Sequence, residues 1–536
     1  MNTLPKLPIG DSSFESIRGN NLLYIDKTRY IYKMADEGKY YFMSRPRRFG
    51  KSLTVSTLRC FFQGKKEMFQ GLWLGQNTQW EWKEHPLIFL DFNGISHDTP
   101  ENLKKSLQRT LEKISEAYDV ICDAPLLKHQ FKELILSLHK KNGMPVVILI
   151  DEYDKPLIDH LGKGREAMET AKANRDILKH FLGVIKDGDV AAVLRFVFIT
   201  GVSKFSRVSV FSELNNLNDI TMNRYYAEML GYTQSEIENC FKSHIKGFAE
   251  EYDCASEQII EQLKIYYNGY RFSERDVRVY NPFSVLKSLA ECAFKNYWFE
   301  TGTPTFLINL LRERNYPLPT IENMEAGEET FSTYEIENLK PEALLFQTGY
   351  VTIKDVEDHI YTFTYPNKEV KLAFQKHLLF SYLDKTVNYS KILRISSYLQ
   401  KGMLNDFMEA MSAVFASIPY SIESKRDEAY FHTVFYLAVS GYGVHADSEV
   451  LSSEGRIDLV MEFPDRVYVI EFKCDRSADK ALRQIHEKNY AQKYQDMGKK
   501  IILMGINFDS QKRNISEWKQ ESYENLMIYR RSENKK

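Results

Sequence analysis

A glycine-lysine-serine turn between an apolar strand and a helix is the feature that most constrains the fold. Residues 39–56 read KYYFMSRPRRFGKSLTVS, which places this turn after a predicted strand and before a predicted helix. Backbone N–H groups at the start of a helix bind phosphate oxygens. Here Gly50 would let the backbone approach a phosphate, Lys51 would reach the β- and γ-phosphates, and Ser52 would offer its hydroxyl to Mg²⁺. The turn therefore predicts a nucleotide site.

A second segment, VVILIDEYDKP at residues 146–156, supplies the other half of such a site. Asp151 and Glu152 follow an apolar strand, where Asp151 would orient Mg²⁺ and Glu152 would polarise the attacking water. The usual pattern GxxxxGK[ST] has glycine where this chain has Arg45, so the turn is incomplete by itself. Together the two segments predict an ATP site in which Ser52 and Asp151 hold Mg²⁺. The candidates for nucleotide binding are Arg48, Phe49, Gly50, Lys51, Ser52, Leu53 and Asp151.

Strands alternate with helices through the first part of the chain, which is typical of a largely parallel sheet covered by helices. A further strand, LRFVFIT, ends at Thr200, where a polar side chain could sense the γ-phosphate. Positive charge for the transition state could come from any of three residues, and the sequence does not choose among them. These are Arg195, Lys204 and Arg207.

Two acids and a lysine form a second candidate site near the other end of the chain. Side chains alternate along a strand, so Glu471 and Lys473 in RVYVIEFK point to the same face. Asp458 ends the segment GRID on the preceding strand, and a hairpin would bring it beside Glu471. Two such carboxylates make a hard oxygen site for Mg²⁺ or Mn²⁺, with Lys473 placed to stabilise negative charge on a phosphate.

Two further acids compete to complete this metal site. Glu449 lies on the strand before Asp458 and Glu428 on the leading helix, and Glu449 is slightly favoured. Arg456 could contact phosphate, and Gln484 could line the cleft. The alternative interpretation is a cross-strand salt bridge on a solvated sheet face, because surface pairs of this kind cost little. The order of elements around the acids, namely helix, three strands, helix and strand, favours the metal site.

Five motifs in one chain give a resemblance to a known family. In order they are RPRRFGKS, LIDEYDKP, FITGVSKFS, NNLNDIT and YNGYRF. This combination resembles the bacterial AAA-ATPase-like family, whose members usually carry a C-terminal PD-(D/E)XK nuclease-superfamily domain. The resemblance covers nearly the whole chain. It implies that Arg45 is normal for this modified P-loop, that the first module is related to AAA and STAND-type ATPases, and that the last elements form a nuclease-like core.

The chain of 536 residues is too long for one hydrophobic core. The predicted fold class is α/β, with a parallel-sheet ATPase domain first and a restriction-endonuclease-like domain last. Four parts are expected. They are an AAA-like P-loop ATPase domain at 1–225, a helical and winged-helix-like middle domain at 226–388, a helical connector at 389–425, and a PD-(D/E)XK nuclease-like domain at 426–530.

The composition is that of a soluble, folded protein, with 43% hydrophobic and 27% charged residues. No segment reaches the length of a membrane span, the first residues lack the apolar core of a secretory signal, and the six cysteines are scattered without a CxxC pair. A cytoplasmic protein without membrane contact is expected. Because the net charge is only −2, any contact with DNA must be local.

The two sites together predict an ATPase that is coupled to a metal-dependent nuclease, with DNA as the expected substrate. Glu152 would act in ATP hydrolysis, and Asp458, Glu471 and Lys473 would act in phosphodiester hydrolysis. The alternative is a nucleotide-dependent signalling or DNA-binding switch whose nuclease-like domain binds without cutting. The oligomeric state stays open, with a homo-oligomer among the options.

Overall fold

The computed structural model describes residues 4–204, 216–299, 305–313, 316, 318, 321–328, 330, 340–383, 389–419, 427–452 and 454–523. The chain forms two compact units. The first comprises Met1–Leu307 with Glu325–Glu369, and the second comprises Ile308–Met324 with Val370–Lys536. The finer division into four parts stays a prediction. Arg207 and the tail after Arg530 lie outside the described residues.

A five-stranded sheet in the order β2-β3-β4-β1-β5 forms the centre of the first unit. All its neighbouring strands run parallel, as predicted from the alternation of strands and helices. Parallel strands end at a common edge, so the polar residues that follow β1, β3 and β4 meet there. The strands are β1 (Tyr40–Ser44), β2 (Leu87–Asp91), β3 (Val146–Asp151), β4 (Leu194–Gly201) and β5 (Asn218–Asp219).

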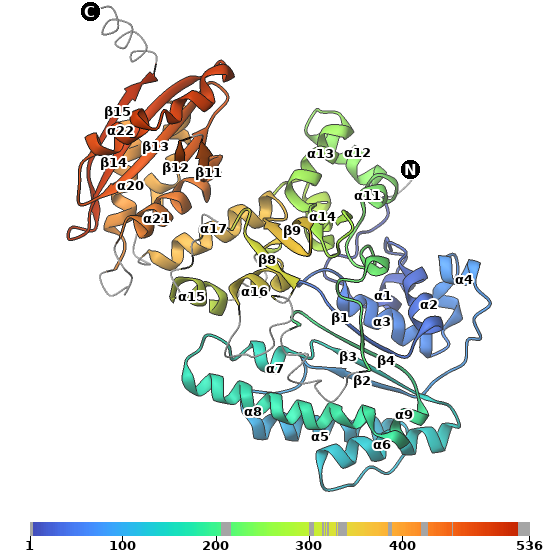
Figure 1. Cartoon of the computed structure of the whole chain (residues 1–536). Helices are drawn as coiled ribbons and strands as arrows, with labels where there is room; N and C mark the ends of the chain where they lie inside the picture. The colour runs from blue at the N-terminus through green and yellow to red at the C-terminus, as the bar shows by residue number, and fades with distance from the viewer. Residues whose placement is uncertain are drawn as a thin grey trace, which may run out of the picture. The chain divides into compact units, whose positions relative to one another are not determined.

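Helices cover both faces of this sheet (Figure 1). One face carries α1 (Phe14–Gly19), α2 (Thr28–Glu37) and α3 (Lys51–Phe62), and the other carries α5 (Pro100–Ala117), α6 (Leu127–Asn142) and α8 (Arg165–Leu182). In α5 the apolar residues recur every four positions, and each is fully buried, so one stripe of the helix faces the core. These residues are Leu103, Leu107 and Leu111.

Four helices that follow the sheet in sequence pack together within the first unit. Their core includes the buried side chains of Ile237, Phe241, Phe248 and Leu263. Thr233 starts the group with a capping box to Glu236, which satisfies the free N–H groups of the first turn. The helices are α11 (Gln234–Cys240), α12 (Lys242–Glu251), α13 (Ser256–Tyr267) and α14 (Pro282–Glu291), and the hairpin of β6 (Tyr270–Arg271) and β7 (Arg278–Val279) separates the last two.

A three-stranded antiparallel sheet in the order β8-β10-β9 completes the first unit. The sequence predicts β-strands over the whole stretch LLFQTGYVTIKDVEDHIYTFTYPN, residues 344–367. For LLFQT this prediction is wrong, since these residues end helix α16 (Pro341–Thr348). Pro341 at its first turn and Gly349 in the left-handed conformation after it delimit the helix. The helix is buried on nearly every side, so its apolar run carries no periodicity that separates helix from strand. The strands are β8 (Glu325–Gly327), β9 (Thr352–Glu357) and β10 (Ile360–Thr364).

The second unit contains a five-stranded mixed sheet in the order β11-β12-β13-β14-β15. Only β13 and β14 pair in parallel, through the crossover helix α22 (Ala478–Glu487). The predicted order of one helix, three strands, one helix and one strand is confirmed, while β15 was not predicted (Figure 1). The strands are β11 (Ala446–Ser452), β12 (Gly455–Glu462), β13 (Arg466–Cys474), β14 (Lys500–Asp509) and β15 (Asn514–Ser522).

Helices lie on both faces of this second sheet. The sequence predicts one helix over SADKALRQIHEKNYAQKY, residues 477–494. The structure interrupts this helix, because Asn489 is left-handed and a 3₁₀ helix covers Tyr490–Met497. The other described helices that lie wholly or partly in the second unit are α15 (Thr305–Glu313), α17 (Lys368–Tyr382), α18 (Tyr389–Ile392), α19 (Ile395–Gln400), α20 (Leu404–Ala416) and α21 (Glu428–Ser440). Among the described residues, no helix is both long enough and apolar enough to cross a membrane.

Gly505 on β14 allows α22 to pack closely on the sheet. It pairs with Glu471 of β13, and a Cβ atom there would lie 2.4 Å from the carbonyl oxygen of Ala478. We expect Gly505→Ala to lower the free energy of unfolding by about 2–3 kcal/mol, as overpacking does in a rigid core. Urea denaturation measures this, with Gly247→Ala as the control, since a Cβ atom at that helical position meets nothing. Equal stability of both variants would contradict the packing argument.

Candidate functional site

The predicted phosphate loop connects β1 to α3, and its backbone is open to a ligand. Gly50 caps α3 with a φ of 95°, and a Cβ atom there would meet no other atom. The buried ammonium of Lys51 donates to the carbonyl oxygens of Arg45, at 3.2 Å, and Pro46, at 3.3 Å. It also lies 3.6 Å from Oε1 of Glu152. A phosphate would offer Lys51 stronger, charged acceptors than these two carbonyls.

Asp151 and Ser52 meet at the end of β3, as predicted for an Mg²⁺ site. Burial raises the pKa of the Asp151 carboxyl to about 6, and the hydrogen bond from Ser52 partly offsets that rise. Glu152 follows with a φ of 51°, a conformation that is rare outside glycine and that costs of order 1–3 kcal/mol. Backbone strain of this kind is concentrated at functional sites.

Arg45, which replaces the first glycine of the usual pattern, is buried behind the loop. Its guanidinium donates to the carbonyl oxygens of Ser44, at 2.9 Å, and Thr221, at 2.5 Å. It stacks over the ring of Phe272 at 4.3 Å. Burial lowers the pKa of Arg45 to about 9. The arginine therefore does not enter the space in front of the loop, where a glycine is otherwise needed.

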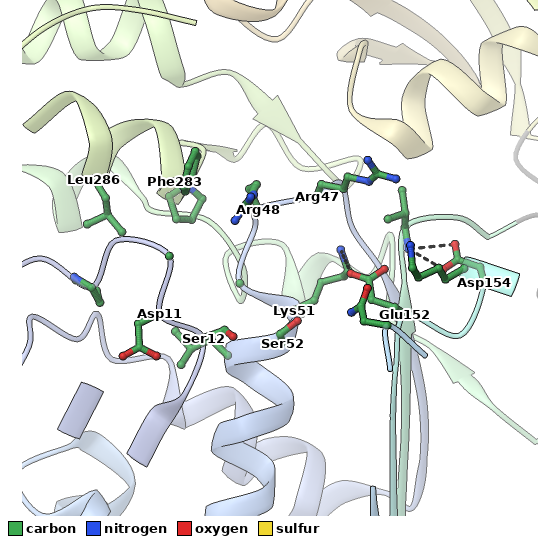
Figure 2. Close-up of a pocket in the computed structure, with 18 of the residues that line it drawn as sticks. Asp11, Ser12, Arg47, Arg48, Lys51, Ser52, Glu152, Asp154, Phe283 and Leu286 are labelled. Carbon is green, nitrogen blue, oxygen red and sulfur yellow. Dashed lines mark hydrogen bonds and ion pairs between the residues drawn. The ribbon is translucent and has the colours of Figure 1, made fainter. Parts of the chain in front are cut away.

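A cavity of about 480 Å³ lies in front of the loop (Figure 2). Six of the predicted site residues line it: Arg48, Gly50, Lys51, Ser52, Leu53 and Glu152. Asp151 does not line it and reaches the site through Ser52. Phe49 does not line it either, because its ring is buried against Tyr270 at 4.7 Å and Phe272 at 5.3 Å. Only the backbone of Phe49 remains as a nucleotide-binding candidate.

Several residues that line the cavity were not predicted. Arg47 and Lys155 could have been predicted from the sequence, because each lies in one of the motifs described above. The same is true of Asp154 and Val202. The others come from segments with no recognisable pattern, and only the fold brings them together. They are Pro8, Gly10, Asp11, Ser12, Asn93, Ile158, Asp159, Tyr232, Pro282, Phe283 and Leu286.

Asp154 joins the ends of β3 and β4 beneath this cavity. The carboxylate is fully buried and accepts hydrogen bonds from the backbone N–H of Val202 at 3.1 Å, and from the N–H and hydroxyl of Ser203, each at 2.6 Å. Burial raises the pKa of Asp154 to about 6. Its position fixes the segment after β4 against the Asp151–Glu152 turn.

The cavity is lined neither by Thr200, the candidate sensor of the γ-phosphate, nor by Arg195 or Lys204, two of the three candidate cations for the transition state. The buried hydroxyl of Thr200 donates to the carbonyl oxygen of Met43 at 2.7 Å. Arg195 is the second residue of β4, at the opposite end from the cavity, and donates to the carbonyl oxygen of Ala35. Lys204 pairs with Asp219 at 2.9 Å. The cations that do line the cavity are Arg47, Arg48, Lys51 and Lys155.

The predicted carboxylate cluster lies across β11, β12 and β13 of the second unit. Oδ2 of Asp458 accepts a hydrogen bond from the N–H of Phe472 at 2.8 Å. The Lys473 ammonium lies 2.9 Å from Oε1 of Glu471, so the two side chains meet on one face as the alternation predicted. Glu471 is almost fully buried, and its Oε2 atom has no hydrogen-bond partner. An unpartnered, buried carboxylate oxygen is costly and calls for a ligand.

Glu449 and Glu428 both lie near this pair. Oε2 of Glu449 accepts from Arg456 at 3.0 Å, and Oε2 of Glu428 accepts from the N–H of Cys474 at 3.2 Å. Each of the two charges raises the pKa of Asp458. Among the described residues, no three acid, histidine or cysteine side chains yet converge as a ready metal centre. The acids would have to draw together around an ion, and their oxygen chemistry suits Mg²⁺ or Mn²⁺.

Two acids of this cluster, Asp458 and Glu471, hold their protons to a higher pH than is usual for a carboxyl. Burial raises the pKa of Asp458 to about 6. Burial and the charge of Asp458 raise the pKa of Glu471 to about 8. A divalent ion would have to displace these protons, so we expect its affinity to rise between pH 6 and pH 8, by up to about tenfold per pH unit. Calorimetric titration with Mn²⁺ in the absence of nucleotide measures this, and an affinity that is constant over the range would contradict it.

Comparisons with known proteins match both parts of the chain. A family model described as "Predicted AAA-ATPase" matches residues 8–211, and a model of the "PD-(D/E)XK nuclease superfamily" matches residues 426–518. A protein of Azotobacter chroococcum mcd 1, named "Uncharacterized protein in vnfD 5'region", is 37% identical over 526 residues, which are 95% of this chain and 98% of that protein. The first matched segment contains the phosphate loop and most of the residues that line its cavity, and the second contains the carboxylate cluster.

Proposed function

The chain belongs to the family of predicted AAA-ATPases with a C-terminal PD-(D/E)XK nuclease-superfamily domain, and on that premise we propose that it hydrolyses ATP. The nucleotide state would control metal-dependent cleavage of nucleic acid in the C-terminal domain, with DNA as the expected substrate. The proposed cleavage activity is supported most directly by Oε2 of Glu471, which is buried without a hydrogen-bond partner beside Asp458 and Lys473. A purely structural salt bridge would leave no such oxygen without a partner.

The cavity of the first unit has the size and chemistry for ATP. Its volume of about 480 Å³ lies in the range of small-molecule sites. At one end Lys51 and the N-terminus of α3 would bind the phosphates, and Ser52 with Asp151 would hold Mg²⁺. Glu152 would orient the attacking water. Tyr232, Phe283 and Leu286 give the cavity an apolar and aromatic wall that suits a purine base.

In the second unit, Asp458 and Glu471 with Glu449 would hold Mg²⁺ or Mn²⁺. A bound divalent ion supplies a nucleophilic hydroxide at neutral pH and polarises the phosphate. Lys473 would turn its ammonium from Glu471 to the scissile phosphate, where it balances the negative charge that develops. The cluster would therefore perform hydrolysis, while Arg456 beside Glu449 would bind the nucleic-acid backbone.

Glu152→Gln is expected to retain ATP binding and to lower the ATP hydrolysis rate by about a hundredfold, since a lost general base costs at least that much. Equilibrium binding of labelled ATP and release of phosphate measure the two effects. Glu166→Gln, an exposed position on α8, is the control. Unchanged hydrolysis in Glu152→Gln would remove this residue from the mechanism.

Cleavage of plasmid and single-stranded DNA with Mg²⁺ or Mn²⁺ tests the coupled function. We expect DNA cleavage by the wild type to depend on ATP. Because Glu152→Gln should bind ATP but hydrolyse it slowly, its cleavage rate shows whether ATP binding or ATP hydrolysis controls cleavage. Metal-independent binding of DNA without any cleavage would instead favour a switch whose nuclease-like domain only binds.

A further inference from the structure

Three residues of the phosphate loop, Arg45, Pro46 and Phe49, are buried against the rest of the first unit. Phe49 packs on Tyr270 and Phe272, and Arg45 stacks on Phe272. A Cβ atom on Gly349 would lie 2.7 Å from the Pro46 side chain, so this backbone also touches the loop. A loop enclosed in this way cannot change conformation without moving what packs on it.

One line of contacts runs from Arg47 to a buried carboxylate. The indole N–H of Trp298 donates to the carbonyl oxygen of Arg47 at 3.0 Å. The backbone N–H of the same tryptophan donates to Oε1 of Glu369 at 2.6 Å. Glu369 is fully buried in the first turn of α17. Trp298 therefore connects the loop backbone to the start of that helix.

A second line reaches the same carboxylate from the nucleotide cavity. The Arg48 guanidinium stacks over the ring of Phe283 at 4.5 Å, and both side chains line the cavity (Figure 2). The neighbouring Ser284 donates its hydroxyl to Oε2 of Glu369 at 2.8 Å. Each oxygen of Glu369 is thus bound by a residue adjacent to the loop or the cavity. Loss of a hydrogen-bond donor to a buried carboxylate costs several kcal/mol, so Glu369 is expected to move together with Trp298 and Ser284.

A third line approaches α17 from the residues before it. Asn367 donates its amide to the carbonyl oxygen of Asn268 at 2.9 Å. Gly269, with a φ of 107°, leaves no room for a Cβ atom against the carbonyl oxygen of Pro366. The next residue after Gly269 is Tyr270, which packs on Phe49 of the loop. Pro366–Glu369 is therefore bound on several sides by residues that contact the phosphate loop.

We propose that Pro366–Glu369 is the coupling element through which the nucleotide site controls the C-terminal unit, with Trp298 and Glu369 as its positioning residues. This inference rests on the proposed function. The next residue along the chain, Val370, begins the second unit. Bound phosphate would compete for Lys51 with the carbonyls of Arg45 and Pro46 and would shift the loop. Trp298 and Ser284 would transmit that shift to Glu369 and hence to α17.

Amide hydrogen exchange in the full-length protein tests the coupling, with and without a non-hydrolysable ATP analogue. In the wild type we expect the analogue to change exchange in α17 by about fivefold, within the usual range of coupling between sites. Trp298→Phe keeps an aromatic ring but removes the indole donor together with part of the ring that packs against Tyr350. It should reduce the change in α17 to less than about twofold while the analogue still protects the phosphate loop. Trp518→Phe, the same substitution in the second unit, should behave as wild type.

Ser284→Ala provides a second variant, since it removes one donor to Glu369 without changing the cavity wall. Protection of the loop in the wild type without any change in α17 would overturn the coupling but leave the ATP site intact. The coupling would also be overturned, with the ATP site intact, if Trp298→Phe and Ser284→Ala both retained the full analogue-dependent change in hydrogen exchange of α17. If the analogue protects no residue of the loop, the proposed ATP site fails, and the coupling fails with it.

Discussion

Asp458→Ala should lower metal-dependent DNA cleavage by about a thousandfold, the loss seen when a group that stabilises transition-state charge is removed. Its Oδ2 atom accepts from the N–H of Phe472, so the carboxylate is fixed at the level where Glu471 and Lys473 lie. Removing it leaves Glu471 without the second carboxylate that a divalent ion needs. Initial rates of plasmid nicking at saturating Mg²⁺ and at saturating Mn²⁺ measure the effect.

The matched control is Asp465→Asn, at the other end of the same hairpin. Asp465 pairs with the neighbouring Arg466 and is exposed, so its removal should leave cleavage unchanged. ATP hydrolysis should be normal in both variants, which excludes global unfolding as the cause. Cleavage by Asp458→Ala at the wild-type rate would remove the nuclease assignment and leave a nucleotide-binding protein with a nuclease-like fold.

The arrangement of the C-terminal acids could be predicted because β-strand geometry is local and regular. Alternation along β13 placed Glu471 and Lys473 on one face, and the hairpin register, in which Leu459 pairs with Ile470, brings Asp458 level with Glu471. The sequence could not show that the lysine pairs with Glu471, nor that Oε2 of Glu471 is left alone. Such details depend on side-chain conformations and on the packing of α22, which no strand pattern contains.

The nucleotide cavity was only half predictable, for a related reason. Lys51 and Asp151 lie in short motifs whose spacing alone indicates their chemistry. Tyr232 reaches the cavity from the segment before α11, and Phe283 reaches it from the first turn of α14. Nothing in their own segments marks them as ligand contacts. Phe49 is the reverse case, because it lies within the motif and was predicted to contact the nucleotide, but its ring packs against Tyr270. A motif fixes the backbone of a loop, whereas long-range contacts decide which of its side chains face the ligand.

Lys51→Ala should lower the rate of ATP hydrolysis by between about a hundredfold and a thousandfold, because it removes the positive charge that would contact the β- and γ-phosphates. Among the described residues, the buried ammonium is held by two backbone carbonyls and, at 3.6 Å, by Glu152, and it can exchange these partners for phosphate. Equilibrium binding should weaken as well, since a charge-assisted contact is lost in a largely enclosed loop.

Lys140→Ala is the control, because this exposed residue of α6 does not line the cavity. If nucleotide state controls the C-terminal unit, Lys51→Ala should also make DNA cleavage insensitive to ATP while Asp458 and Glu471 remain intact. Hydrolysis of ATP by Lys51→Ala at the rate of Lys140→Ala would show that the phosphates bind elsewhere. Lost hydrolysis combined with cleavage that still responds to ATP would separate the two sites and require a second nucleotide site.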